Sequence, residues 1–144
     1  MPTSKIFLAD VNVWLAIVSR RHVHVRLCCT WFDSLRSRSV NFCRVTQMGL
    51  LRLLTNQSAM GKDVLTSREA WCVYDVILSD ERVSFSLEPF SLEPLWKELT
   101  DRARRTAKVW TDAYLAAFAE TAGTQLVTLD RAILALAPGA LLLS

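Results

Sequence analysis

The sequence predicts an α/β fold with a mainly parallel sheet. Short apolar segments, such as residues 5–9 and 125–129, alternate along the chain with longer segments whose apolar residues recur at helical spacing. Several of the short segments are apolar throughout, which is typical of strands buried on both faces of a parallel sheet. The chain has 144 residues, of which 51% are hydrophobic and 22% charged, and this suits a single domain over residues 1–144 with a sizeable core.

The N-terminal third predicts a strand, two helices and a second strand, in that order. Residues 5–9 form an apolar run that predicts a buried strand, and a helix is expected over residues 13–19. Residues 23–37 predict an amphipathic helix, because four apolar residues recur at intervals of four, namely Val23, Leu27, Trp31 and Leu35. Residues 39–43 predict the second strand.

Two further helices are predicted from capping residues, one on each side of a polar segment. Thr46 occupies a position typical of an N-cap, ahead of an apolar segment that reaches the polar one. The polar residues 56–63 predict a loop. Thr66 and Glu69 have the spacing of a capping box, which predicts a helix that runs to about Leu78.

The C-terminal part predicts three strands and three helices. The strands are expected at residues 83–85, 125–129 and 140–143. A connector over residues 86–94, which contains two prolines, precedes a helix over residues 95–106. Thr111 is expected to cap a helix that ends at Gly123, since glycine is favoured just after a helix. A short helix is expected over residues 131–136.

The charge and the cysteines narrow the class of protein. A net charge of +3 permits an anionic partner without requiring one. The four cysteines, Cys28, Cys29, Cys43 and Cys72, form no CxxC pair or zinc pattern, which indicates reduced core thiols in a cytoplasmic protein. The N-terminus lacks the features of a signal peptide, and no segment approaches the length of a membrane span. We therefore expect no membrane association.

Three aspartates lie at positions expected to face one end of the sheet. Asp10 and Asp130 each directly follow a predicted strand, and Asp112 follows Thr111 at a predicted helix start. Sites in open parallel sheets form beyond the carboxyl ends of the strands. Taken singly, each aspartate is explained as a turn or helix-start residue. Together they predict a site for Mg²⁺ or Mn²⁺, because a hard divalent cation offsets the repulsion between carboxylates and activates water for attack on a phosphodiester.

Four segments resemble, in order, the successive motifs of the PIN-domain family: LADVNVWLA, VTQMGLLRLLTN, WTDAYLAAFA and LVTLDRA. Within that family the sequence is most similar to the VapC-type toxins of toxin–antitoxin pairs. The resemblance implies a PIN-like three-layer α/β/α fold with about four to five strands. It also implies an endoribonuclease that cleaves structured RNA of the translation machinery, a cognate antitoxin and a homodimer.

The resemblance also implies the site residues. Its motifs assign catalytic and metal-binding roles to Asp10, Asp112 and Asp130. Supporting polar groups are expected at Asn12, Thr46 and Thr111. The second motif commonly has a Glu where this chain has Gln47, a fourth catalytic candidate whose side chain offers an oxygen but no negative charge. We therefore expect weaker metal binding than at a site with four acids.

Basic and aromatic residues near the acids are candidates for RNA contact. The basic candidates are Arg104, Arg105, Lys108 and Arg131, since phosphate contacts supply most non-specific affinity for nucleic acids. A solvated helix end explains residues 102–108 equally well. Arg52, on an otherwise apolar helix, is a candidate for pairing with an antitoxin carboxylate. The five tryptophans are expected in the core or a subunit interface, with base stacking as a lesser alternative for Trp110.

Two other functions stay open on the sequence. A PIN-fold module that binds RNA or an antitoxin without catalysis would share these motifs, and Gln47 favours it. A receiver-like signalling domain also gathers acids and Mg²⁺ at strand ends. It places two acids together near its first strand, whereas Asp10 has no acidic neighbour. A Rossmann-type cofactor domain is disfavoured because the chain has only four glycines and no GxGxxG.

Overall fold

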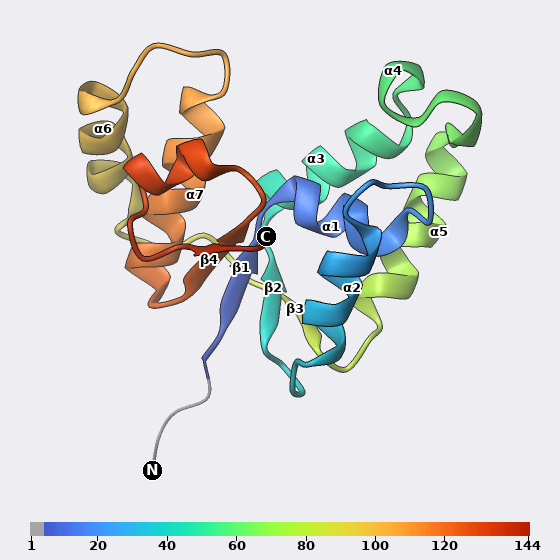
Figure 1. The fold of residues 1–144 in the computed structure, drawn as a ribbon. Coiled ribbons are helices and arrows are strands. Elements are labelled where there is room, and N and C mark those ends of the chain that lie inside the picture. The colour runs from blue at the N-terminus through green and yellow to red at the C-terminus, as the bar shows by residue number, and fades with distance from the viewer. Residues whose placement is uncertain (1–4) are drawn as a thin grey trace.

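A computed structural model describes residues 5–144 and contains one parallel sheet (Figure 1). The strands are β1 (Phe7–Ala9), β2 (Val40–Phe42), β3 (Val83–Phe85), β4 (Gln125–Thr128) and β5 (Leu141–Leu142). They lie in the order β3-β2-β1-β4-β5, and every pair of neighbours is parallel. This confirms the predicted parallel sheet of four to five strands. Residues 1–4, part of the single domain expected over residues 1–144, lie outside the described residues.

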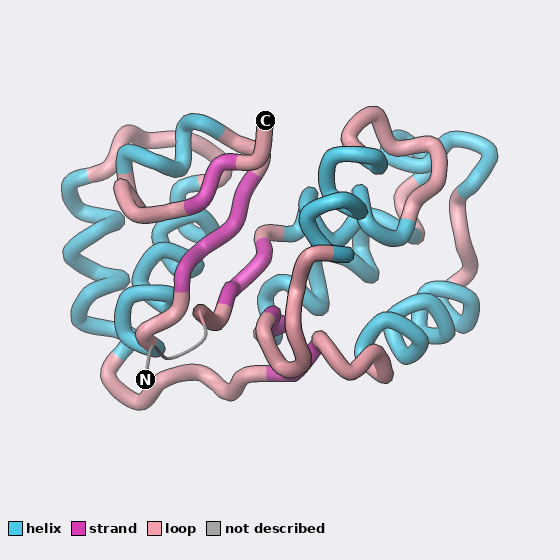
Figure 2. Tube along the Cα trace, turned by 60° about the horizontal axis from the view of Figure 1, so that its bottom comes forward, coloured by secondary structure: helices cyan, strands magenta, loops and turns pink. Residues whose placement is uncertain are grey.

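Helices cover both faces of the sheet and give three layers. They are α1 (Val11–Val18), α2 (Val25–Asp33), α3 (Arg44–Leu54), α4 (Gln57–Met60), α5 (Ser67–Leu78), α6 (Leu92–Arg102) and α7 (Val109–Ala122), with 3₁₀ segments η1 (Gly61–Asp63) and η2 (Arg131–Ala135). In Figure 1, α6 and α7 lie on one side of the strands, and α1, α2 and α5 lie on the other. Figure 2 shows the strands between these two groups of helices. The three-layer α/β/α prediction is confirmed.

The sheet divides the core into two apolar clusters. Leu8 and Ala9 are neighbours on β1 and are both fully buried, one in each cluster, because successive strand residues point to opposite faces. In the first cluster, Trp14 of α1 stacks on Phe42 of β2 with ring centroids 3.8 Å apart. In the second, Phe118 and its neighbours on α7 pack with residues of α6 and η2. Burial on both faces explains the strongly apolar strand sequences.

The order of the strands creates a switch point between β1 and β4. The chain passes outward from β1 through β2 to β3, and then returns to the other side of β1 as β4 and β5. β1 and β4 pair in parallel with Ala9 opposite Val127, and the Asp10 backbone N–H donates to the Val127 carbonyl at 2.9 Å. Ligand sites of open α/β sheets form at such points, beyond the carboxyl ends of the strands.

Two predicted N-caps are wrong, because the helices begin earlier than their threonines. The N-cap of α3 is Cys43, and the Thr46 hydroxyl accepts a hydrogen bond from the Cys43 N–H at 2.9 Å as the third residue of that helix. The N-cap of α7 is Lys108, and the Thr111 hydroxyl donates to the Lys108 carbonyl at 3.2 Å. A threonine in the first turn therefore satisfies backbone groups much as a cap does, and the sequence pattern does not separate the two positions. The capping box predicted ahead of α5 is confirmed.

The helix predicted over residues 23–37 is shorter than expected and buries a different face. α2 begins after His24, so Val23 precedes it and is 85% exposed. Its buried residues are Cys28 and Phe32, each one position beyond an apolar residue of the expected stripe. The predicted buried face was therefore wrong at Val23, because α2 packs against α1 through the stripe of residues next to the predicted one.

Three further expectations differ from the structure. The segment 56–63, predicted as a loop, contains α4 and η1. Pro94, placed in the connector, lies in the first turn of α6, where a missing backbone N–H removes no helical hydrogen bond. Cys72 is exposed, so the expectation of core thiols holds for Cys28 and Cys43 but not for that residue. No helix within residues 5–144 is long and apolar enough to cross a membrane.

Candidate active site

The three predicted aspartates line one cavity. Asp10 is the N-cap of α1 at the end of β1, and Asp130 is the N-cap of η2 shortly after β4. Asp112 lies in the first turn of α7. All three line a cavity of about 390 Å³ whose opposite wall is α3. In Figure 1 this region lies between α3 and α7, at the end of the sheet where β1 leads into α1.

Hydrogen bonds orient the Asp10 carboxylate. Its Oδ1 accepts a hydrogen bond from the Val11 backbone N–H at 2.7 Å, and its Oδ2 accepts one from the Thr128 hydroxyl at 3.2 Å. Thr128 is completely buried, and its Oγ1 also accepts a hydrogen bond from the Asp130 backbone N–H at 3.0 Å. The Thr128 hydroxyl therefore connects the two strand-end aspartates.

The carboxylates are electrostatically coupled. Burial raises the pKa of Asp10 above its usual range, its hydrogen bonds with Val11 and Thr128 lower it, and the charge of Asp130 raises it. The pKa of Asp112 rises to about 6, first through burial and then through the charges of Asp10 and Asp130. Lys108, which also lines the cavity, acts in the opposite direction on the pKa of both Asp10 and Asp112. Ionising several carboxyl groups in one cavity is costly, and a bound cation would reduce that cost.

The donor set suits a hydrated hard cation. The acidic ligands available are carboxylate oxygens, which Mg²⁺ and Mn²⁺ prefer over nitrogen or sulfur. Within residues 5–144, no three His, Cys, Asp or Glu side chains are close enough together to form a compact metal-binding group. Mg²⁺ usually keeps several waters and takes only one or two carboxylates directly. The residues present therefore fit a cation held partly through water.

The predicted supporting residues separate into two groups. Asn12 and Thr111 line the carboxylate cavity. Thr46 is fully buried and bonds only within the first turn of α3. Gln47 is also buried, its Oε1 accepts a hydrogen bond from the Arg44 guanidinium, and it is absent from the residues that line the cavity. A catalytic role for Gln47 stays a prediction.

The predicted RNA-binding residues are likewise spread over more than one surface. Lys108 lines the carboxylate cavity together with Arg52 of α3. Arg104 and Arg105 line a separate cavity formed by the segment between α6 and α7 together with Thr100 and Trp110. Arg131 is exposed at the start of η2, beside Asp130.

Two residues that matter for this geometry escaped the sequence analysis. Thr128 was seen only as part of an apolar strand, because its role depends on β4 lying beside β1. Gly49 of α3 packs against the start of α1, and a Cβ atom at this position would lie 2.5 Å from Val11 Cγ2. A glycine inside an apolar helical segment is a signal of close packing and was available in the sequence.

A comparison with known families decides the identity of the fold. The PIN domain model matches residues 7–137. The chain belongs to the PIN-domain family. This PIN domain is 46% identical over 132 residues to Ribonuclease VapC41 from two strains of Mycobacterium tuberculosis, covering 88% of this chain and 90% of that protein. It is a VapC-type ribonuclease, the toxin class of toxin–antitoxin pairs, as the motifs indicated.

Solved structures support the same PIN fold at lower identity. FitAcB from Neisseria gonorrhoeae superposes with a TM-score of 0.66 at 17% identity, covering 95% of this chain and 96% of that one. VapC20 from Mycobacterium tuberculosis, described as a sarcin–ricin loop cleaving toxin, gives a TM-score of 0.63 at 17% identity, covering 85% and 87%. At these identities the likeness concerns the fold alone. PIN-domain ribonucleases of the VapC type are typically metal-dependent.

Proposed function

We propose that this chain cleaves RNA by metal-dependent hydrolysis at the centre formed by Asp10, Asp112 and Asp130. The observation that carries the proposal is that three carboxylates from separate segments line one cavity, where burial and the neighbouring negative charges raise the pKa of Asp10 and Asp112. Stability alone favours the separation of such charges, so their convergence indicates a cationic ligand.

The residues of the cavity have different roles in the reaction. Bound Mg²⁺ or Mn²⁺ would supply a Lewis acid that lowers the pKa of water and neutralises charge on the phosphodiester. Asp10 is held in one orientation by Val11 and Thr128, and each of its oxygens keeps lone pairs for a ligand. Lys108 and Arg52 place positive charge on the cavity wall, where the RNA backbone would approach.

The substrate and partners belong to the same proposal. The substrate is a structured RNA of the translation machinery, as the motifs implied; VapC20, which shares the fold, is described as cleaving the sarcin–ricin loop. A cognate antitoxin and a homodimer follow from the toxin class, and the antitoxin would act by covering the carboxylate cavity. We place the chain in the cytoplasm, where such an RNA would be met.

Cleavage of total cellular RNA by purified protein, freed of any antitoxin, tests the proposal. Reactions contain Mn²⁺, Mg²⁺ or EDTA, and an Asp10→Ala protein is run beside the wild type. Asp101→Asn is the matched control, because it removes an exposed carboxylate of α6 that does not line the cavity. We expect discrete fragments with either metal from the wild type and from Asp101→Asn, and none with EDTA or from Asp10→Ala.

Two outcomes would contradict the proposal. Cleavage that persists in EDTA or in Asp10→Ala would exclude a metal-dependent centre at Asp10. Absence of cleavage at any metal concentration, from folded protein that still binds RNA, would support the non-catalytic binding module instead. Gln47→Glu would then be the first substitution to test for a gain of cleavage.

A further inference from the structure

A second cavity lies at the N-terminal end of α7, which also contributes residues to the carboxylate cavity. It has a volume of about 520 Å³ and is lined by the segment 103–107, by Thr100 of α6 and by Trp110. Trp110 is two residues before Asp112, so the two side chains leave α7 in different directions, and Lys108 at the same end of the helix lines the carboxylate cavity. A chain bound across this end of α7 would therefore meet both cavities.

The Trp110 indole is exposed but held in place. It is 62% exposed, an unusual position for the largest apolar side chain. The Trp96 Nε1–H donates to the Trp110 backbone carbonyl at 3.0 Å, and the two rings meet edge to face with centroids 6.3 Å apart. Trp96 is itself packed edge to face on Tyr114, at 5.3 Å. Trp110 therefore offers an open surface on a braced ring, so that little conformational entropy is lost when a ligand stacks on it.

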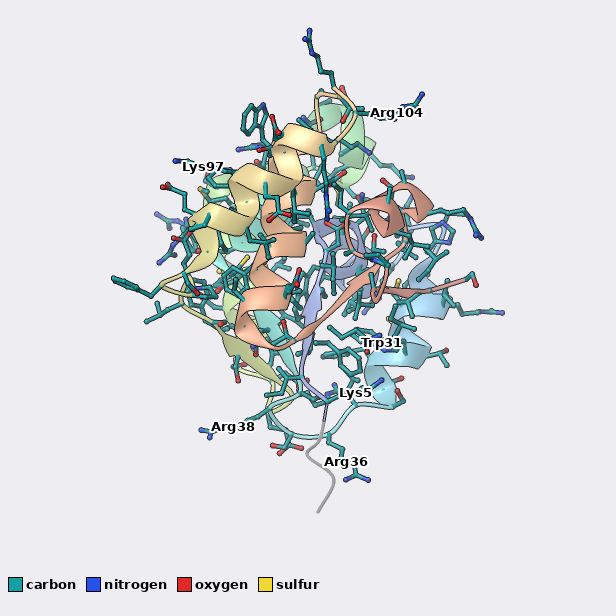
Figure 3. All side chains as sticks on the ribbon, turned by 90° about the vertical axis from the view of Figure 1, so that its left-hand side faces the viewer. Lys5, Trp31, Arg36, Arg38, Lys97 and Arg104 are labelled. Carbon is teal, nitrogen blue, oxygen red and sulfur yellow. The ribbon has the colours of Figure 1, made fainter. Side chains whose placement is uncertain are left out.

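The same cavity is positively charged. Arg104 and Arg105 line it together with Trp110. Figure 3 shows Arg104 at the top of the view, on the loop that follows α6. A flat aromatic surface beside guanidinium groups matches a ligand with a planar base and an anionic backbone.

We propose that the cavity formed by Trp110, Arg104 and Arg105 binds an unpaired nucleotide of the RNA substrate, next to the phosphodiester cleaved at the carboxylate cavity. The base stacks on Trp110 and the adjoining phosphates contact the arginines. This inference rests on the proposed ribonuclease site. Its consequence is a preference for loops over duplex RNA, because paired bases are not free to stack on a side chain.

Binding in EDTA tests the subsite separately from cleavage. Fluorescence anisotropy is measured with a labelled ten-nucleotide oligouridylate and with an abasic oligomer of the same length. We expect Trp110→Ala to weaken binding of the oligouridylate by about 10- to 100-fold, the range for loss of one stacked base, and to leave binding of the abasic oligomer unchanged. Trp110→Phe should retain most of the affinity. Trp71→Ala, which removes an exposed tryptophan of α5, is the matched control and should have no effect.

Substitution of the arginines should affect binding differently from substitution of Trp110. Arg104→Ala and Arg105→Ala should weaken the binding of both oligomers about equally. Each should also reduce the steepness of log affinity against log salt by the amount expected for about one phosphate contact. Equal binding of oligouridylate by Trp110→Ala and wild type would overturn the stacking proposal. So would a change in oligomeric state in Trp110→Ala, measured by light scattering, because it would assign the ring to a subunit interface. Either failure leaves metal-dependent cleavage intact, whereas loss of cleavage in Asp10→Ala with normal oligouridylate binding separates the two sites.

Discussion

Replacement of Asp112 by Asn should stabilise the metal-free protein at neutral pH. The pKa of Asp112 rises from its usual 3.8 to about 6, so its ionised form is disfavoured in the folded chain. At about 1.36 kcal/mol per pH unit, this corresponds to at most about 3 kcal/mol. Asp112 is only partly buried, and a negative charge in the first turn of α7 gains roughly 0.3–1 kcal/mol from the helix dipole. The expected net gain for Asp112→Asn is therefore about 1–2 kcal/mol.

The pH dependence gives the sign of this effect. Because the pKa is higher in the folded chain, the folded chain binds the proton more tightly, and stability falls as pH rises from about 4 to about 6. Urea denaturation of wild type and Asp112→Asn in EDTA, at pH 7 and at pH 4, measures the difference in free energy of unfolding. The gain should be present at pH 7 and should nearly disappear at pH 4.

Metal and a control variant complete the test. Millimolar Mn²⁺ should stabilise the wild type more than Asp112→Asn, because the cation binds the ionised carboxylates of the folded state. Asp101→Asn should change stability little at either pH, since Asp101 is exposed. The reasoning is refuted if Asp112→Asn is no more stable than wild type at pH 7, or if its gain is equally large at pH 4.

Two further substitutions examine the walls of the cavity. Gly49→Ala should destabilise the fold by about 1–3 kcal/mol in thermal or urea denaturation, because the added Cβ would lie 2.5 Å from Val11 Cγ2. Gly139→Ala is the control, since the space around Gly139 is open. Equal stability of the two variants would refute the close contact. Thr128→Val should lower the free energy of unfolding by about 1 kcal/mol and raise the pKa of Asp10, because the carboxylate loses a hydrogen bond. The pH profile of cleavage should then move to higher pH. An unchanged profile would show that the Thr128 hydroxyl does not act on Asp10.

The order of the strands and helices was accessible from the sequence, because it depends on local patterns. The apolar strands at residues 5–9 and 125–129 are each followed closely by an aspartate, and this alone predicted that Asp10 and Asp130 share one end of the sheet. The prediction succeeded because parallel strands all end at the same edge. Asp112 was expected to begin its helix, whereas α7 begins three residues earlier, at Val109, and Asp112 lies in the first turn.

The face that each helix turns toward the site was harder to predict from the sequence. The second motif predicts Gln47 as a catalytic candidate, and this role stays a prediction; the residues of α3 that line the cavity include Met48, Gly49 and Arg52. Helical periodicity identifies which residues share a face, but several apolar faces compete in α3. Packing against α1 and α5 decides which one turns to the site.

By itself, the sequence determined most of the strands and helices, the parallel class of the sheet, the PIN-domain family and the placement of the three aspartates at one end of the sheet, since each depends on short segments or on a recognisable set of motifs. Only the tertiary structure decided the partner of Asp10, the facing residues of α3 and the braced position of Trp110. The Asp10–Thr128 hydrogen bond joins residues 118 positions apart. Such a contact exists because burial on both faces of the sheet brings β4 beside β1, and no local pattern in either strand specifies that neighbour.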